Sequence, residues 1–332
     1  MVGHMHIVVR RFLFSFFVLF FLVAAPLVVL YTAGYRLNIS NRRLQQTGVL
    51  AITTFPRGSN ILLNGQNLAQ KSPFLVQRVM PNTHAIVLSK KGYHDWSQRI
   101  RVDEGRTTYI TARLFANSQP SLLNANASAL ALRSRLAANL ITVDTASVTF
   151  TNNGANVEVH SGSGSTDQLI ALLPINDYEL LRDDAEYLLL RDARNVAFVI
   201  ARQGGKVVKL PTELTAYDWL ANQDLLLWTD GTEVHIYAAA LENDTFVTRD
   251  GQSIVDVAWH PEADSFFVAG STRIDAYDIS IHETREVTNL LTDTQIVDIW
   301  TDSSGKHLYY LDHELTDNLK DATLVYKLPL SL

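Results

Sequence analysis

The chain has 332 residues, of which 47% are hydrophobic, and it contains no cysteine. This composition allows a substantial core, and the lack of cysteine excludes disulfides, thiolate metal sites and cysteine nucleophiles. Residues 1–119 contain 14 Lys and Arg against 3 Asp and Glu, whereas residues 120–332 contain 14 against 31. This asymmetry predicts a domain boundary near Pro120 and argues against nucleic acid as a partner of the acidic part.

Residues 12–33 form an apolar run without charge, FLFSFFVLFFLVAAPLVVLYTA, and predict a transmembrane helix. As a helix the run spans about 33 Å, compared with about 30 Å of hydrocarbon in a bilayer. Tyr31 and Tyr35 fall where an interfacial aromatic belt lies. The alternative is a cleaved signal peptide with Arg10 and Arg11 as its basic region. Because the run is longer than the roughly 7–15 apolar residues of such peptides, we expect an uncleaved single-pass anchor.

The orientation of this anchor depends on the basic residues around it. Two arginines precede the run and three follow it closely, so the positive-inside rule separates the two ends only slightly. A short basic tail ahead of the first apolar segment favours a cytoplasmic N-terminus. We predict that residues 1–35 are a short cytoplasmic tail and the anchor in the cell membrane. Residues 36–47 are then a juxtamembrane linker, and the later domains lie outside the cytoplasm.

Residues 48–115 alternate short apolar strands with frequent Gly and Pro, a pattern typical of a β-sandwich of about seven strands. Pro56-Arg57-Gly58 predicts a turn, since proline presets φ. Asn64-Gly65 predicts a hairpin, because both residues tolerate positive φ. The net charge of this segment is +6, which favours contact with anionic lipid headgroups near the anchor.

Within this segment, the run PRGSNILLNG, followed by SPFLV and PNTHAIVLSKKGYHDW, resembles a PEGA domain. The residues that match the pattern of that family are Pro56, Gly58, Asn64, Gly65, Pro73, Pro81, Lys90, Gly92 and Tyr93. The departures, all tolerable at turns, are Arg57 for an acidic residue, Ser59 for alanine, Ala69 for glycine, Ser72 for threonine and Asn82 for glycine. The resemblance implies a small surface-associated β-module without established catalytic residues. It therefore supplies a fold and a location but no chemistry.

Residues 120–332 contain five repeats of about 40 residues, which predict a five-bladed β-propeller. The residues that mark the end of the first strand recur at spacings of 40, 39, 40 and 41: Leu140, Leu180, Trp219, Trp259 and Trp300. A turn and two or three further strands follow each marker, and four antiparallel strands form one blade. The turns resemble those of WD40-like and TolB-like blades. The fold class we predict is therefore all-β, with one N-terminal transmembrane helix, a PEGA-like β-sandwich and a five-bladed β-propeller.

The last repeat ends after its third strand, so a closed ring needs one strand from elsewhere. Residues 121–129, SLLNANASA, precede the first repeat and have no other assigned role. We predict that they form a strand of the fifth blade, because an unpaired strand edge would otherwise remain exposed. A ring of six or seven blades completed by a partner protein is the alternative.

The sequence lacks the common motifs for nucleophilic catalysis, dinucleotide or phosphate binding and calcium binding, and we expect no catalytic residue, no cofactor and no metal site. One candidate cluster consists of Asp218, Asp256 and Asp298, which lie shortly before three of the tryptophan markers on the predicted innermost strands. Carboxylates that converge at the mouth of a propeller channel suit acid–base chemistry or sugar binding. The alternative interpretation is that each one caps a strand or pairs with a neighbouring blade.

We therefore expect a non-enzymatic, membrane-anchored, extracytoplasmic binding or scaffold protein. The helix contacts membrane lipid, the sandwich acts as a spacer, and the propeller binds a protein or an envelope polymer. One alternative is a membrane-tethered propeller enzyme that acts on envelope glycans or another polymer. A second is a sensor whose helix transmits occupancy, but the nine residues before Arg10 are too few for an output domain.

Overall fold

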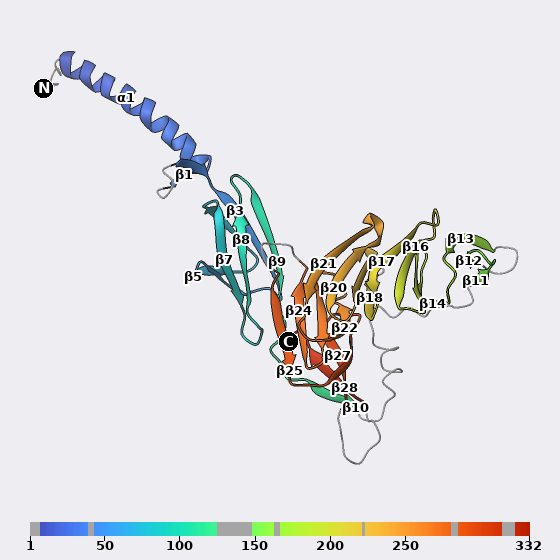
Figure 1. Cartoon of the computed structure of the whole chain (residues 1–332). Helices are drawn as coiled ribbons and strands as arrows, with labels where there is room; N and C mark the ends of the chain where they lie inside the picture. The colour runs from blue at the N-terminus through green and yellow to red at the C-terminus, as the bar shows by residue number, and fades with distance from the viewer. Residues whose placement is uncertain are drawn as a thin grey trace. The chain divides into compact units, whose positions relative to one another are not determined.

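The computed structural model describes residues 7–38, 43–124, 148–162, 167–220, 223–279, 285–313 and 323–332. The described chain is mostly strand, with one long helix at its N-terminal end (Figure 1). It forms two compact units. The first consists mainly of Met1–Lys91 and Asp95–Leu114, and the second of Gly92–His94, Phe115–Ile279 and Glu286–Leu332.

Helix α1, Ile7–Thr32, begins the first unit and is about 39 Å long at 1.5 Å per residue. Its segment Val9–Thr32 is long and apolar enough to cross a membrane, and none of it is buried in the structure. The helix ends at Thr32, and Gly34 follows with a φ of +82°, the left-handed conformation that often terminates helices. The predicted apolar N-terminal helix is therefore confirmed.

A two-stranded hairpin follows the helix directly. Strands β1, Tyr35–Asn38, and β2, Arg43–Gln46, pair antiparallel, and all of their residues except Tyr35 belong to the segment predicted as a linker. Thr47 then joins the hairpin to the helix end, because its backbone N–H and its Oγ1 both donate to the carbonyl of Gly34 at 2.9 Å. The helix thus continues into the next domain through hydrogen-bonded structure.

Seven strands follow, as the sequence predicts, and form two sheets in the orders β6-β3-β9 and β5-β4-β7-β8. Strands β3 and β9 are parallel, and the other pairs are antiparallel. The strand bounds are β3 Gly48–Phe55, β4 Asn60–Leu63, β5 Gln66–Lys71, β6 Phe74–Val79, β7 Asn82–Ser89, β8 Trp96–Val102 and β9 Thr107–Arg113. Strand β8 shows why a sandwich forms: its residues alternate strictly between buried and exposed, so one face enters the core.

The turns predicted from Pro, Gly and Asn occur in this sandwich. Asn64 and Gly65 both have positive φ, 51° and 80°, and connect β4 to β5. Two of the residues that depart from the PEGA pattern, Ser59 and Ser72, are buried and contact the hydroxyl of Thr54. Hydroxyl side chains at these turns therefore satisfy one another inside the core.

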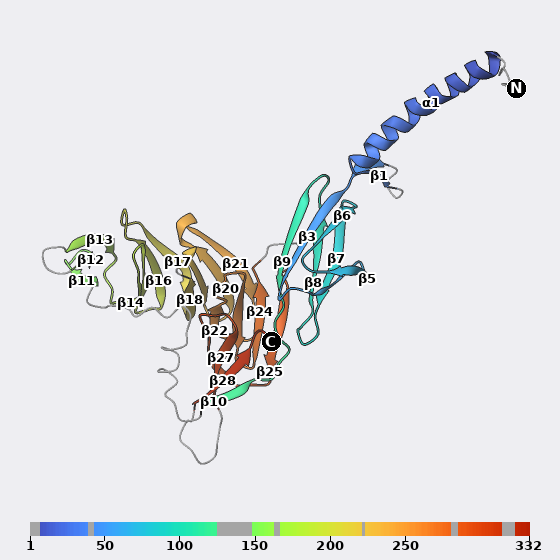
Figure 2. The ribbon, with the colours of Figure 1, turned by 180° about the vertical axis from the view of Figure 1, so that it is seen from behind.

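The described part of the second unit contains five antiparallel sheets, which follow one another along the chain (Figures 1 and 2). The first sheet has three described strands: β11 Val148–Asn152, β12 Val157–Ser161 and β13 Gln168–Leu173. The second has β14 Tyr178–Asp183, β15 Tyr187–Asp192, β16 Val196–Ala201 and β17 Val207–Glu213. The third has β18 Ala216–Leu220, β19 Leu225–Thr229, β20 Glu233–Ala238 and β21 Asn243–Arg249, with the short 3-10 helix η3 Ala239–Leu241 before β21. The fourth has β22 Ile254–Trp259, β23 Ser265–Gly270, β24 Arg273–Asp278 and β25 Val287–Thr292.

The fifth sheet combines the beginning and the end of this unit, in the order β10-β28-β27-β26. Its strands are β10 Ser121–Asn124, β26 Ile296–Thr301, β27 His307–His313 and β28 Thr323–Pro329. The prediction that the segment before the first repeat supplies a strand of this sheet is confirmed for residues 121–124, while residues 125–129 lie outside the described residues. The marker Leu140 also lies outside them, and the number of blades in a ring stays a prediction.

Candidate functional site: the inner strands of the repeat unit

The three carboxylates singled out from the sequence lie on the first strands of successive sheets. Asp218 is on β18, Asp256 on β22 and Asp298 on β26. Asp256 is buried, whereas Asp218 and Asp298 are half-buried. Asp256 and Asp298 each follow a β-bulge in their strand, which places the two at corresponding positions.

Two of these carboxylates connect neighbouring sheets. Asp218 in the third sheet accepts a hydrogen bond from the backbone N–H of Trp259 in the fourth, at 2.7 Å. Asp256 in the fourth sheet accepts one from the N–H of Ile299 in the fifth, at 2.9 Å, and another from Val257 in its own strand at 2.9 Å. Bonds from backbone N–H to an ionised carboxylate are stronger than neutral ones. These side chains therefore join sheets, and the convergence of the three at a channel mouth stays a prediction.

Two further side chains link the fourth sheet to the fifth. Thr301 Oγ1 donates to the carbonyl of Trp259 at 2.8 Å. His260, only 1% exposed, contacts the carbonyl oxygen of Gly305 through Nε2 at 3.0 Å, while its Nδ1 accepts from the N–H of Glu262 at 3.3 Å. Its Nδ1 also lies 3.5 Å from a carboxylate oxygen of Asp264. The turn residue His260 thus joins two neighbouring turns.

The tryptophan markers are not structurally equivalent. The predicted alignment of the last repeat is wrong by one residue, because Ile299 rather than Trp300 corresponds to the earlier markers. Trp219 packs among residues of the second sheet, and Trp259 packs among residues of the third, so both face the preceding sheet. In β26 the residue that faces the preceding sheet is Ile299, and Trp300 packs on the opposite side with Tyr309. Adjacent residues of a strand point to opposite faces, so a spacing of 41 moved the marker to the other face.

A buried arginine lies between the second and third sheets. The side chain of Arg182 on β14 is 4% exposed, and its Nε donates to Asp184 at 2.8 Å. Its guanidinium also lies 4.9 Å from the ring centroid of Trp219, a cation–π contact. Burial lowers the pKa of Arg182, while the charges of Asp184 and Asp218 raise it, and an arginine stays cationic throughout. Arg182 therefore supplies a fixed positive charge near Asp184 and Asp218.

Two histidines in the second unit are each bracketed by two carboxylates. In the first sheet, His160 lies 3.2 Å from Glu158 and 3.1 Å from Asp167. In the third sheet, His235 lies 3.3 Å from Glu233 and 2.8 Å from Asp244. The repeated tripeptide Glu-Val-His is the signal that would have revealed the pair, because residues two apart in a strand share a face. Within the described parts of the chain, no group of three or more His, Asp or Glu side chains is suited to hold a metal ion.

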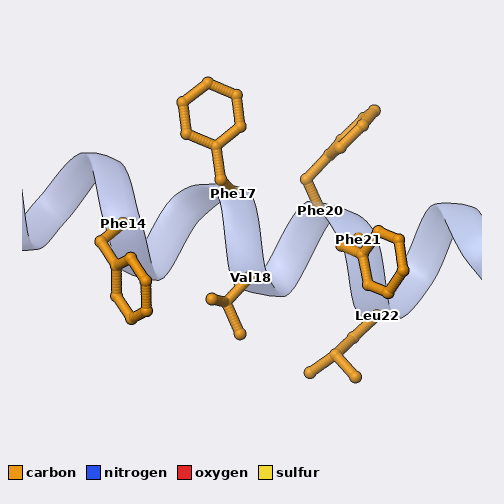
Figure 3. Close-up of a pocket in the computed structure, with 6 residues that line it drawn as sticks. All are labelled: Phe14, Phe17, Val18, Phe20, Phe21 and Leu22. Carbon is orange, nitrogen blue, oxygen red and sulfur yellow. The ribbon is translucent and has the colours of Figure 1, made fainter.

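The second candidate surface is helix α1 itself. Its exposed side chains include Phe14, Phe17, Val18, Phe20, Phe21 and Leu22, which point outward on several sides of the helix (Figure 3). Apolar exposure all around a helix is typical of contact with lipid rather than with one flat protein surface. The helix therefore has the surface that a membrane anchor needs.

Comparisons with known proteins identify one domain of the chain. Residues 47–117 match the PEGA domain family. No match was found among curated proteins. Similar solved structures include a mitotic checkpoint complex, with 13% identity over 75% of this chain and 72% of the other and a TM-score of 0.39. They also include Hsv2p of Kluyveromyces lactis, with 10% identity, coverages of 69% and 68%, and a TM-score of 0.36.

A third similar structure is the β-propeller domain of Cps50 (Swd1) from Myceliophteria thermophila, with 15% identity, coverages of 41% and 51%, and a TM-score of 0.34. Similarities of this size say nothing about what the chain binds, so its architecture rests on its own sheets. Successive four-stranded antiparallel sheets are the architecture of β-propellers. The chain therefore carries an apolar helix that fits a membrane anchor, a PEGA domain at residues 47–117 and a repeat unit of the β-propeller type.

Proposed function

We propose that this protein is a membrane-anchored binding or scaffold protein whose repeat unit, outside the cytoplasm, binds a protein or an envelope polymer. The observation that carries the proposal is the use of Asp218 and Asp256 as acceptors for backbone N–H groups of the next sheet. Carboxylates held in this way stiffen the unit rather than turn toward a substrate. A rigid set of sheets presents a recognition surface at a low cost in conformational entropy.

Membrane attachment is tested with the full chain. It should stay in the membrane fraction after alkaline extraction, because α1 is apolar on all sides. Protease added to spheroplasts should digest the chain beyond Arg36. Release of the chain from the membrane at alkaline pH would contradict an integral anchor. Protection of the repeat unit from the protease would show that the orientation is the reverse of the proposed one.

Binding is separated from catalysis by the combined substitutions Asp218→Asn, Asp256→Asn and Asp298→Asn. Asparagine keeps an oxygen acceptor for a backbone N–H but carries no charge, so the fold is expected to persist. Ligand binding by the variant should stay within a few-fold of the unsubstituted protein. If the unsubstituted protein hydrolyses envelope glycans and the folded variant does not, the protein is an enzyme and the proposal is wrong.

The location of the binding surface is tested by photo-crosslinking in intact cells. A photoreactive residue at Phe246, a 54% exposed side chain on β21, should give adducts of defined mass. The matched control is Tyr109, a 75% exposed aromatic residue on β9 of the PEGA domain. Equal adducts at both positions, or adducts at Tyr109 alone, would contradict the assignment of binding to the repeat unit.

A further inference from the structure

The hairpin β1–β2 has one apolar and one basic face. In its register Leu37 lies directly opposite Leu44, and Arg36 lies opposite Gln45. Residues two apart share a face, so the leucine pair belongs to one face and Arg36 and Arg43 belong to the other. Such a division is typical of elements that lie at a membrane surface, with arginines among the headgroups and leucines below them.

Both leucines of this cross-strand pair are exposed. Leu37 is 65% exposed and Leu44 is 49% exposed. An isolated two-stranded hairpin is only marginally stable in water, so this one needs a surface to cover its apolar face. The occupant must therefore offer apolar contact next to groups that attract arginine.

The connection to α1 identifies that surface. Tyr35, the first residue of β1, follows the last helical residue by only three positions. The hairpin is also bonded to the helix end, because Gln46 Nε2 donates to the carbonyl of Ala33 at 3.2 Å. Gly34 and Thr47 form the additional bonds described above. A hairpin fixed at the end of a membrane-spanning helix lies at the level of the lipid headgroups.

A residue of the PEGA domain is held at the same level. Arg78 lies near the end of β6. Its Nη1 donates to the hydroxyl of Tyr31 at 3.0 Å. Its guanidinium carbon lies 4.8 Å from the centroid of the Tyr31 ring. Since Tyr31 is in the last turn of α1, Arg78 joins Arg36 and Arg43 beside the membrane surface.

We propose that the hairpin β1–β2 is an interfacial element that binds anionic phospholipids. Leu37 and Leu44 insert at the boundary between headgroups and acyl chains, and Arg36, Arg43 and Arg78 bind lipid phosphate. Arginine suits this role because its planar guanidinium forms paired hydrogen bonds with phosphate oxygens. The proposal rests on the membrane anchor of the proposed function and adds the lipid class and the residues that select it.

The depth of the hairpin is measured on the full chain in lipid nanodiscs. Because the chain has no cysteine, Leu44→Cys introduces one thiol for a nitroxide label. The collision rate of the label with oxygen, relative to a water-soluble nickel chelate, should be several-fold higher at position 44 than at Leu75→Cys. Leu75 is the matched control, since it is a 54% exposed leucine on β6 of the same unit. Equal ratios at the two positions would overturn the proposal.

The lipid class is tested by charge. The combined substitutions Arg36→Gln, Arg43→Gln and Arg78→Gln should abolish the enrichment of phosphatidylglycerol over phosphatidylcholine around the solubilised full chain. Substituting three other exposed arginines of the unit, Arg57, Arg99 and Arg101, removes the same charge and should leave most of that enrichment. Equal losses in the two variants would show a general charge effect and would overturn the proposed site.

Two controls separate the remaining explanations. If added inorganic phosphate at constant ionic strength removes the lipid enrichment, the arginines form a site for free phosphate and the proposal is overturned. Alkaline extraction is measured on the same preparations. A chain that is extracted contradicts the anchor, whereas a retained chain with a water-exposed label at position 44 contradicts only the interfacial hairpin.

Discussion

Replacing Asp256 with alanine is expected to loosen the fourth and fifth sheets. The carboxylate is 7% exposed and accepts from the backbone N–H groups of Ile299 and Val257, both at 2.9 Å. A buried donor left without an acceptor costs about 1–3 kcal/mol, so the two together lower the free energy of unfolding by roughly 2–6 kcal/mol. For a unit of this size, that corresponds to a decrease in melting temperature of roughly 4–24 °C.

The assay is thermal unfolding of the detergent-solubilised chain, combined with hydrogen exchange at the backbone of β26. Asp256→Asn keeps one oxygen acceptor and should lose roughly half as much stability as Asp256→Ala. The matched control is Asp177→Ala, because Asp177 is an exposed aspartate of the same unit, and its loss should stay within about 0.5 kcal/mol. If Asp256→Ala has the same melting temperature as Asp177→Ala, and the backbone N–H of Ile299 exchanges no faster than in the unsubstituted protein, the carboxylate does not hold the sheets together.

Two further predictions concern the turns and the pH dependence. Gly305→Ala should destabilise the chain more than Gly154→Ala: both glycines have positive φ, but only at Gly305 would a Cβ lie 2.6 Å from the ring of His260. Equal melting temperatures would refute the close contact. Asp302 is the second case, because burial raises its pKa but hydrogen bonds, chiefly with His307 at 2.7 Å, outweigh this and hold it below the usual value. A lowered pKa stabilises the fold above about pH 4 and loses this effect as pH falls further, so Asp302→Asn should melt lower than the unsubstituted protein at pH 7 and should approach it below about pH 4.

The strands of both units were predictable because their signals are local. In the PEGA domain, Asn64-Gly65 requires positive φ at two positions, and the structure has both. In the repeat unit, the second and third strands are short apolar runs separated by turn residues, and β15, β16, β23 and β24 occur where those runs lie. Local signals of this kind need no knowledge of the neighbouring sheets.

What the sequence did not reveal depends on contacts between sheets. The partner of Asp218 is 41 residues away and that of Asp256 is 43 residues away, so no local pattern indicates them. The hairpin β1–β2 was missed because polar residues around Arg43 resemble a linker, and its leucine pair becomes visible only through the register. Likewise, no local pattern indicates the cation–π contact between Arg182 and Trp219, because the two residues belong to different sheets.

The two end sheets of the repeat unit differ in the faces that a closed ring would bring together. In the first sheet, the side turned away from the second sheet carries Glu158 and His160, which are paired with each other at 3.2 Å. In the fifth sheet, the side turned away from the fourth carries Trp300, Tyr309 and Val325, all at most 5% exposed. The aromatic face is already buried, whereas the pair of Glu158 and His160 is partly exposed, so the two faces differ in chemistry. The period of about 40 residues therefore predicts the repeat but not how a ring closes, because closure depends on contacts between sheets that lie far apart in the sequence.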